Sequence, residues 1–369
     1  MAERQKKTIA NRNYGVDFLR IISMFMVVLL HVLKQGGILD SLEPFSLKYE
    51  FTWFIEIASL CAVNCYALTS GYVGVYAKHK YSNLALLWLR VFYYSVIITL
   101  CFFFIFPETV GKKAVVSSLF PVMTNQYWYF STYFFLFLLM PVLNLALTNL
   151  DKKALKYILL SVVLLGSVLL PVFQMVFVDP FKLGNGYSVL WLMVLYLIGG
   201  YIRKYGMLTK LKSISLFLLY ILSISLTWCS KLIIQIVTKS VFGEIKYDQM
   251  WVSYISITIV IAAICLFLVF ERINVNLAGM KLISLFAPMA FSVFLIHTHP
   301  LVFEFMKNRF IWVADLPLAF MFLSIIAIAI CVYFMCSLLD IIREWLFRIL
   351  SLKNRLDTLE RLLKRKIKD

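Results

Sequence analysis

Residues 255–270 read ISITIVIAAICLFLVF, a run without a charged side chain, and this stretch decides the class of fold. Two similar runs, IISMFMVVLL over residues 21–30 and VIITLCFFFIF over residues 96–106, show that it is not isolated. In total 62% of the 369 residues are hydrophobic and 15% are charged, whereas soluble domains are about 45–50% apolar. A soluble globule could not bury so many apolar side chains, and disorder is excluded. We therefore predict an all-α, polytopic integral membrane protein.

Windows of about 20 apolar residues, the length that crosses a bilayer as a helix, predict about ten membrane spans. The predicted spans cover residues 14–34, 51–75, 83–106, 127–147, 155–178, 187–202, 213–238, 250–270, 283–303 and 315–341. The seven cysteines all lie within apolar runs, which argues against a disulfide framework. We expect one membrane domain over residues 1–341.

The segment after the last span, residues 342–369, has a different pattern. From Arg343 onward Leu and Ile recur every three or four positions, with nine Lys and Arg residues among them. This pattern predicts a basic amphipathic helix that lies on the anionic cytoplasmic leaflet. A helix that binds a partner is the alternative.

The net charge of +17 would indicate a nucleic-acid partner in a soluble protein, but in a membrane protein it is read loop by loop. The two termini and the loops after spans two, four, six and eight carry 24 Lys and Arg, and the other loops carry 9, when Lys34 and Lys156 at the span ends are counted with the adjoining loops. Because Lys and Arg concentrate on the cytoplasmic side, both termini are expected in the cytoplasm of a multi-pass cell-membrane protein, with no nucleic-acid partner. The oligomeric state stays open.

Ionisable residues within a span are functional candidates, and three of them share the first span. Asp17 and Arg20 are three residues apart and can pair on one helical face. His31 follows Arg20 by eleven residues, which returns to nearly the same face about 16 Å further along. One helix thus carries a cation toward the cytoplasm and an imidazole toward the outside. The alternative is that Arg20 reaches the inner headgroups and His31 is a satisfied interfacial residue.

Residues of other spans can be compared with His31 and Arg20 by their predicted depth in the membrane. Glu56 in span two and His297 in span nine are predicted near the depth of His31. A histidine with an acidic partner suits general-base work on a hydroxyl group.

At the inner level, Arg90 and the turn that contains Ser70 are predicted near the depth of Arg20. An arginine cluster suits a phosphate-rich ligand, because guanidinium groups offer bidentate donors. Lys231, near the outer end of span seven, is expected to extend toward the membrane surface.

Aromatic residues gather at the outer mouth of span four, at Tyr127, Trp128, Tyr129 and Tyr133. They are typical of an interfacial belt, and a stacking platform for a sugar ring is the alternative. His297 and His299 could form half of a metal site only if the helix breaks at Pro300, so no metal is expected.

Four segments resemble the membrane acyltransferases of the acyltransferase-3 family. YGVDFLR at Tyr14–Arg20, followed after ten residues by His31, is similar to the family's Arg-x10-His signature. LTSGY at residues 68–72 is similar to its Ser-Gly-Phe/Tyr segment, YWYF at residues 127–130 to its entry into span four, and FSVFLIH at residues 291–297 to its late histidine segment. The four follow the family's order, and the chain resembles its stand-alone members.

The resemblance implies transfer of an acyl group, most often acetyl from cytoplasmic acetyl-coenzyme A, to a sugar hydroxyl of a bacterial cell-surface or envelope polysaccharide. It implies that Arg20, with help from Arg90 and the Ser70 turn, holds the coenzyme A phosphates and that Asp17 orients Arg20. His31 would remove the acceptor proton or carry the acyl group, oriented by Glu56 or His297. Tyr127 and Trp128 would contact the glycan acceptor.

Two other functions are compatible with the sequence. A transporter or flippase of a glycan or lipid-linked intermediate would also combine ten spans with buried ionisable groups. A structural partner in a polysaccharide-synthesis complex is the other possibility.

Overall fold

The computed structural model describes residues 12–173 and 178–366, and within these ranges every regular element is a helix. The α-helices are α2 Tyr14–Lys34, α3 Leu47–Leu60, α4 Ala62–Gly74, α5 Tyr81–Ile105, α6 Lys112–Leu119, α7 Trp128–Asn149, α8 Lys152–Leu164, α9 Leu170–Phe173, α10 Val189–Tyr205, α11 Ser213–Phe242, α12 Ile257–Glu271, α13 Leu277–Phe286, α14 Ala290–His297, α15 Pro300–Met306, α16 Leu318–Ile349 and α17 Leu352–Lys366. The predicted all-α membrane bundle is confirmed.

Eight helical segments of the described chain are long and apolar enough to cross a membrane. α3 and α4 form one of them, and α13 and α14 form another. Two shorter helices, α10 with 17 residues and α12 with 15, stand where spans six and eight were predicted. At 1.5 Å per residue they reach about 25 and 22 Å, less than a 30 Å hydrocarbon core. The predicted count of ten spans is therefore approximate.

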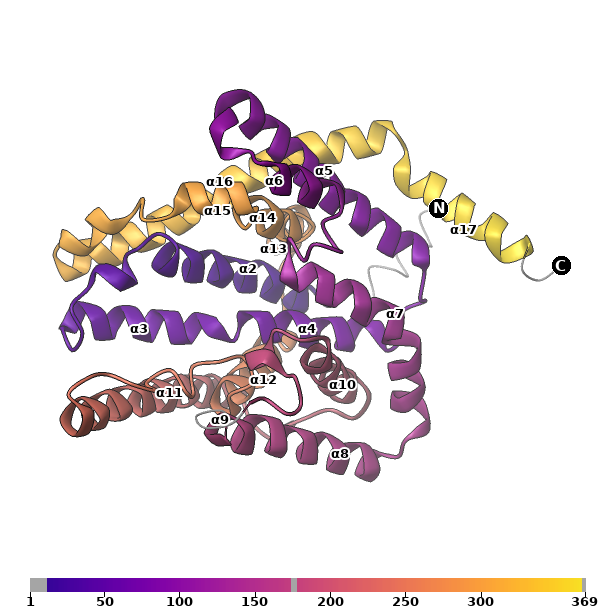
Figure 1. The fold of residues 1–369 in the computed structure, drawn as a ribbon. Coiled ribbons are helices and arrows are strands. Elements are labelled where there is room, and N and C mark those ends of the chain that lie inside the picture. The colour runs from indigo at the N-terminus through magenta and orange to yellow at the C-terminus, as the bar shows by residue number, and fades with distance from the viewer. Residues whose placement is uncertain (1–11, 174–177, 367–369) are drawn as a thin grey trace.

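α2 occupies the centre of the bundle and packs against α3, α4, α12, α14 and α16. Figure 1 shows α2, the α3–α4 pair, α11 and α16 extending along the same general direction of the molecule. Both faces of α2 are therefore covered by other helices, which explains why most of its side chains are buried. Its ionisable residues lie inside protein and not in lipid, the arrangement that charged groups in a membrane require.

α4 and α10 pack closely because glycines lie at their contact. A Cβ atom on Gly71 would collide with the main-chain carbonyl of Tyr196, and one on Gly199 would collide with that of Leu68. Small residues allow such backbone approach between membrane helices. The contact holds the second half of α4 against the middle of α10.

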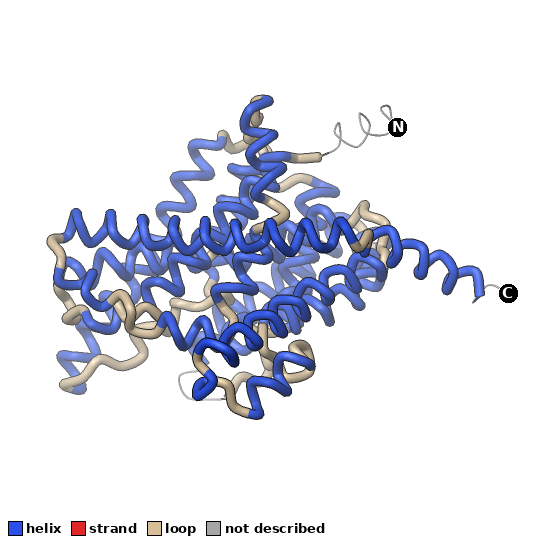
Figure 2. Tube along the Cα trace, turned by 90° about the horizontal axis from the view of Figure 1, so that it is seen from above, coloured by secondary structure: helices blue, strands red, loops and turns tan. Residues whose placement is uncertain are grey.

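The predicted amphipathic C-terminal helix is present as α17, although it begins at Leu352 because α16 continues to Ile349. Figure 2 shows α16 crossing the length of the molecule before α17 projects beyond it. α17 contacts the start of α5, where the Ser82 amide donates to Glu360 over 3.0 Å and the Ser82 hydroxyl donates to Asp357 over 2.6 Å. Lys80, the N-cap of α5, makes no side-chain cap bond, so Glu360 of α17 accepts from the free Ser82 amide at this helix start, while Asp357 accepts from the Ser82 hydroxyl.

Candidate active site

His31 and His297 form a hydrogen-bonded pair in the middle of the bundle. Nδ1 of His31 lies 2.9 Å from Nε2 of His297, and the ring centroids are 5.1 Å apart. His31 lies near the end of α2 and is partly buried, whereas His297 closes α14 and is 1% exposed. The structure therefore brings together two of the three residues predicted for the catalytic group.

The hydrogen bonds of His297 fix the tautomer of both rings. Nδ1 of His297 lies 2.5 Å from the main-chain carbonyl of Val293, and because a carbonyl only accepts, Nδ1 carries the proton. In a neutral ring Nε2 of His297 is then an acceptor, so Nδ1 of His31 donates to it. Nε2 of His31 is left with a free lone pair and has no hydrogen-bond partner among the described residues. That nitrogen can accept a proton or attack a carbonyl carbon.

Glu56, the third predicted member, has another partner. Its carboxylate lies 3.4 Å from the ammonium of Lys34, and the Glu56 side chain is 2% exposed while that of Lys34 is 48% exposed. Lys34 also lies over the ring of Trp53, at 5.5 Å from its centroid. Lys34 follows His31 by one helical turn. Glu56 therefore contacts this end of α2 at Lys34 and, within the described part of the chain, no hydrogen bond or ion pair joins it to His31 itself.

Asp17 and Arg20 form the predicted pair, with Nη1 of Arg20 donating to Asp17 over 2.9 Å. Arg12 donates to the other carboxylate oxygen over 2.5 Å, so one buried carboxylate holds two guanidinium groups. These residues line a cavity of about 410 Å³, the arginine cavity, which is formed by Arg12, Asn13, Val16, Asp17, Arg20, Tyr72, Val73, Tyr76, Ala77 and Arg203. Its position at the start of α2 puts it at the opposite end of that helix from His31.

Arg203 is a member of this cavity that the sequence analysis missed. It lies in the last turn of α10, donates to the Tyr72 hydroxyl over 2.8 Å and stacks on the Tyr72 ring at 4.8 Å. Tyr72 in turn donates to Glu271 over 2.9 Å. The depth comparison made for Arg90 applies equally to the end of predicted span six and could have found Arg203.

Ser70 precedes this cavity by one helical turn of α4 without lining it. Its hydroxyl donates to the main-chain carbonyl of Tyr66 over 3.0 Å. The Tyr66 hydroxyl donates to the main-chain carbonyl of Arg20 over 2.7 Å. Ser70 is thus linked to Arg20 through Tyr66, and its hydroxyl bond is internal to α4.

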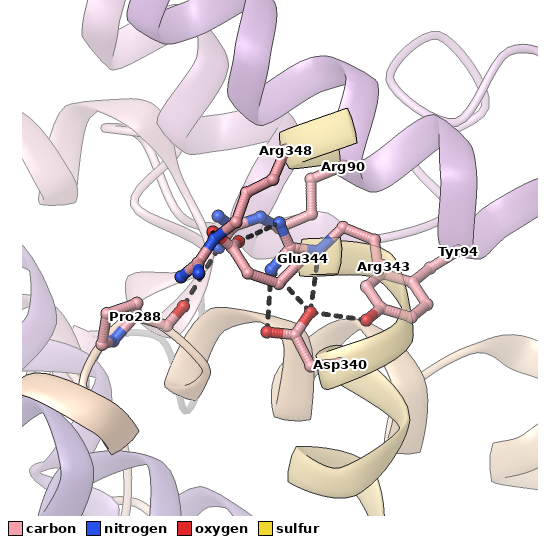
Figure 3. A network of polar contacts seen from close by, with 7 residues as sticks. All are labelled: Arg90, Tyr94, Pro288, Asp340, Arg343, Glu344 and Arg348. Carbon is pink, nitrogen blue, oxygen red and sulfur yellow. Dashed lines mark hydrogen bonds and ion pairs between the residues drawn. The ribbon is translucent and has the colours of Figure 1, made fainter. Parts of the chain in front are cut away.

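Arg90 belongs to another network, shown in Figure 3, where it lies beside the end of α16 and donates to the main-chain carbonyl of Pro288 over 3.1 Å. In this network Arg343 makes two bonds of 2.8 Å to Asp340, and the Tyr94 hydroxyl donates to Asp340 over 2.6 Å. Pro288 stands in the turn between α13 and α14, just before the helix that carries His297. The structure therefore does not bring Arg90 into the arginine cavity.

His31 faces a small apolar space, the histidine chamber, of about 40 Å³. It is lined by Met24, Val27, Leu30, His31, Val63, Tyr66, Trp128, Tyr129, Tyr254, Phe291 and Phe294. Trp128 is among these residues, whereas Tyr127 packs against Phe294 and His299 outside the chamber. Of the two residues predicted to bind substrate, only Trp128 lies beside His31.

A third space, the polar cavity of about 440 Å³, adjoins the chamber at Tyr254, which lines both. Its lining consists of Lys34, Leu60, Pro171, Asn185, Tyr187, Tyr247, Asp248, Gln249, Met250, Val252, Ser253 and Tyr254. Amides, hydroxyls and aromatic rings dominate it, a set suited to a polyhydroxylated ligand. His31 thus stands between a polar cavity on one side and the arginine cavity on the other.

Two other ionisable groups lie outside these cavities. His299 is buried, with Nε2 3.3 Å from the main-chain carbonyl of Ser95 and Nδ1 accepting from the Leu301 amide, and no metal-binding cluster occurs in residues 12–173 and 178–366. The expectation that Lys231 reaches the membrane surface is wrong. It is fully buried, with its ammonium 4.6 Å from the ring centroids of both Tyr49 and Trp53, because these rings and nearby carboxylates offer it a favourable site.

Comparison with known proteins assigns the chain to a family. The family model described as an acyltransferase domain, that of the acyltransferase-3 family, matches residues 13–336. The match includes His31, His297, Arg20 and Arg203, begins just after Arg12 and ends within α16, and it supports membrane acyltransferase activity. No curated protein and no solved structure showed significant similarity. Because the match covers nearly the entire chain, this protein belongs to the acyltransferase-3 family of membrane acyltransferases.

Proposed function

We propose that this acyltransferase takes an acyl group, acetyl in the first instance, from coenzyme A in the arginine cavity and transfers it to a sugar hydroxyl in the polar cavity. The observation that carries the proposal is the free Nε2 of His31 in a chamber between two polar spaces. One of these spaces is cationic and the other is rich in neutral hydrogen-bonding groups. Donor and acceptor can therefore approach the same histidine from opposite ends.

The arginine cavity suits the phosphates of coenzyme A. Arg12, Arg20 and Arg203 line it, and guanidinium groups bind phosphate through paired hydrogen bonds. Asp17 neutralises part of this charge and fixes the direction of two of the three groups. From Arg20 the face of α2 continues through Met24 and Val27 to His31, and the pantetheine arm would follow this face toward the chamber.

His31 acts as the general base in the transfer. Its Nε2 takes the proton of the acceptor hydroxyl as the hydroxyl oxygen bonds to the thioester carbonyl carbon. The carbon–sulfur bond breaks, its electron pair stays on sulfur, and the coenzyme A thiolate receives the proton from His31. The products are an O-acyl sugar and the free thiol of coenzyme A. His297 is a positioning residue that holds the tautomer of His31.

We place the arginine cavity at the cytoplasmic side of a cell membrane and the polar cavity at the outer side. The distribution of 24 basic residues against 9 supports this orientation, as does the cytoplasmic supply of coenzyme A thioesters. Both termini are then cytoplasmic, and the basic helix α17 would lie along anionic headgroups with its exposed Leu359, Leu362 and Leu363. The acceptor would be a glycan of the cell envelope.

A glycan transporter needs a passage of sugar width between the two cavities. The chamber of about 40 Å³ is far below the several hundred cubic ångströms typical of sites for whole ligands. It favours transfer of a small group over passage of a sugar.

The test is acyl transfer by the purified full-length protein in lipid nanodiscs. Acetyl-coenzyme A is added together with envelope polysaccharide from a strain that lacks the gene. Release of the coenzyme A thiol is followed over time, and acetyl groups on the polysaccharide are detected by mass spectrometry. We expect both signals with the parental protein and neither with His31→Ala. In a parallel assay with the protein in sealed vesicles, passage of polysaccharide across the membrane without thiol release would favour the transporter.

A further inference from the structure

The three cavities differ in size in a way that bears on the acyl group. The arginine and polar cavities measure about 410 and 440 Å³, whereas the chamber beside His31 measures about 40 Å³. The chamber is thus about one-tenth the size of either neighbouring cavity, so it favours the smallest acyl group. An acetyl group has three non-hydrogen atoms.

We propose that the histidine chamber admits an acetyl group and excludes longer acyl groups, with Met24, Val27 and Val63 setting this limit. The inference rests on the proposed function, since it concerns the donor of that reaction. The family assignment does not say which acyl group is transferred. The inference is that three side chains of this protein determine it.

The position of the limiting residues supports this assignment. Met24 and Val27 stand on the same face of α2 as His31, one turn apart, and Val63 faces them from α4. All three are at most 6% exposed. A thioester carbon within reach of the acceptor at His31 must therefore place its alkyl end among these side chains.

Aromatic rings close the remaining walls and limit how far the chamber can widen. Phe294 contacts the rings of Tyr129 and His297, at centroid distances of 6.2 and 6.4 Å. Trp128 contacts Tyr187 at 4.4 Å and Tyr254 at 6.1 Å. Close-packed interiors resist added methylene groups, because the extra volume forces side chains from their preferred rotamers.

The polarity of the chamber adds a second restriction. Its lining has no charged side chain, and the nearest cations in the cavities on either side are Arg20 and Lys34, each engaged with a carboxylate. A succinyl group would bring a carboxylate into this apolar space without a partner, which is costly. The chamber therefore selects against longer and against charged acyl groups.

The test compares acetyl-, propionyl-, butyryl- and succinyl-coenzyme A as donors, with kcat/KM for thiol release as the measurement in nanodiscs. The parental protein should prefer acetyl over butyryl by about tenfold or more, since one methylene in a fitted pocket changes discrimination by about 10-fold to 200-fold. Val27→Ala removes two carbon atoms from the wall and should reduce this preference by about tenfold.

Val28→Ala is the matched control, because Val28 is the next residue of α2, is also buried, and does not line the chamber. It should keep the parental donor order. If Val27→Ala does not fold, Met24→Ala opens the same wall, and its control is Met26→Ala, another buried methionine of α2 outside the chamber.

The outcomes separate the inference from the proposed function. Thiol release from acetyl- and butyryl-coenzyme A at similar rates by the parental protein would overturn the size limit and leave the acyltransferase reaction intact. An identical donor order in Val27→Ala, Met24→Ala and their controls would also overturn it. Absence of thiol release from every donor would overturn the proposed function and the inference with it.

Discussion

Nδ1 of His31 lies 2.9 Å from Nε2 of His297, although 266 residues separate the two along the chain. The pair forms because α14 packs against α2 and ends at the level of His31. The carbonyl of Val293, one turn earlier in α14, accepts from His297 and so sets the donor and acceptor roles in the hydrogen bond between His297 and His31. A main-chain group thus determines which nitrogen of His31 is free.

Changes to the two histidines should therefore have different consequences. His31→Ala removes the base and should lower kcat by about 100-fold or more. His297→Leu leaves the base without its acceptor and should lower kcat by about tenfold with KM for the donor unchanged. His297→Gln offers an amide oxygen in place of Nε2 and should recover part of the loss. Equal activity of the Leu and Gln variants would show that the hydrogen bond does not matter.

The arginine cavity predicts donor binding by a residue that is remote in sequence from the Arg20 motif. Arg203→Lys keeps the charge but loses the stacking on Tyr72 and the planar donor group, so the Kd for coenzyme A should rise about tenfold. The measurement is calorimetric titration of the protein in detergent. Arg272→Lys is the control, because Arg272 binds the carbonyls of Leu208 and Leu211 and does not line the cavity. An equal Kd for both variants would exclude Arg203 from the donor site.

The ion pair between Lys34 and Glu56 predicts an asymmetric effect on stability. Lys34→Gln leaves a buried carboxylate without its cation and should lower the free energy of unfolding by about 1–3 kcal/mol, a range reduced because Lys34 is half exposed. Glu56→Gln leaves a cation that water can reach and should cost less. Thermal denaturation in detergent measures both, and the double variant should be more stable than Lys34→Gln alone. The opposite ranking would mean that the pair is not formed.

The sequence predicted the helical spans well because a hydrophobic run of 20 residues can adopt few structures other than a membrane-spanning helix. It also predicted the Asp17–Arg20 pair, since spacing along one helix fixes the relative direction of two side chains. Comparison between helices was weaker. Residue counting gives the depth of a side chain in the membrane, but it gives no rotation about the helix axis.

Glu56, Arg90 and Arg203 illustrate this difference. Glu56 was predicted beside His31 but pairs with Lys34, and Arg90 was predicted beside Arg20 but donates to the Pro288 carbonyl. Arg203 enters the arginine cavity because the glycine contact packs α4 closely against α10 and Arg203, further along α10, then reaches Tyr72. The partner of each of these side chains depends on how the helices pack against one another. Residue spacing within one helix does not determine that packing.

The contact between α17 and α5 predicts a dependence on pH. Burial opposes ionisation of Glu360, but hydrogen bonds from Lys364 and from Ser82 lower its pKa to about 2. A carboxyl group with a lowered pKa stabilises the contact above its usual range near 4.5, and this contribution is lost as the pH falls toward 2.

Docking of α17 should therefore persist across the neutral range. Glu360→Ala should abolish it and expose the Ser82 amide, which hydrogen exchange measures, while Thr358→Ala on the same helix should leave protection unchanged. Rapid exchange of Ser82 in the parental protein at pH 7 would contradict this account.

Variants of Arg90 can distinguish two roles: donor binding, which the sequence predicted, and support of the turn before α14, which the structure indicates. If Arg90 holds the turn before α14 through the Pro288 carbonyl, Arg90→Met should disturb His297, lower kcat by several-fold and leave the Kd for coenzyme A unchanged. Arg90→Lys keeps a donor on a stem of similar length and should restore part of kcat. Arg348→Met is the control, because Arg348 lies in the same network in Figure 3, is exposed, and has a side chain that bonds Glu344 and no other described residue. A weaker Kd for coenzyme A in Arg90→Met, with kcat at saturating donor unchanged, would instead assign Arg90 to the donor site. That result would require α5 to approach the arginine cavity when the donor binds.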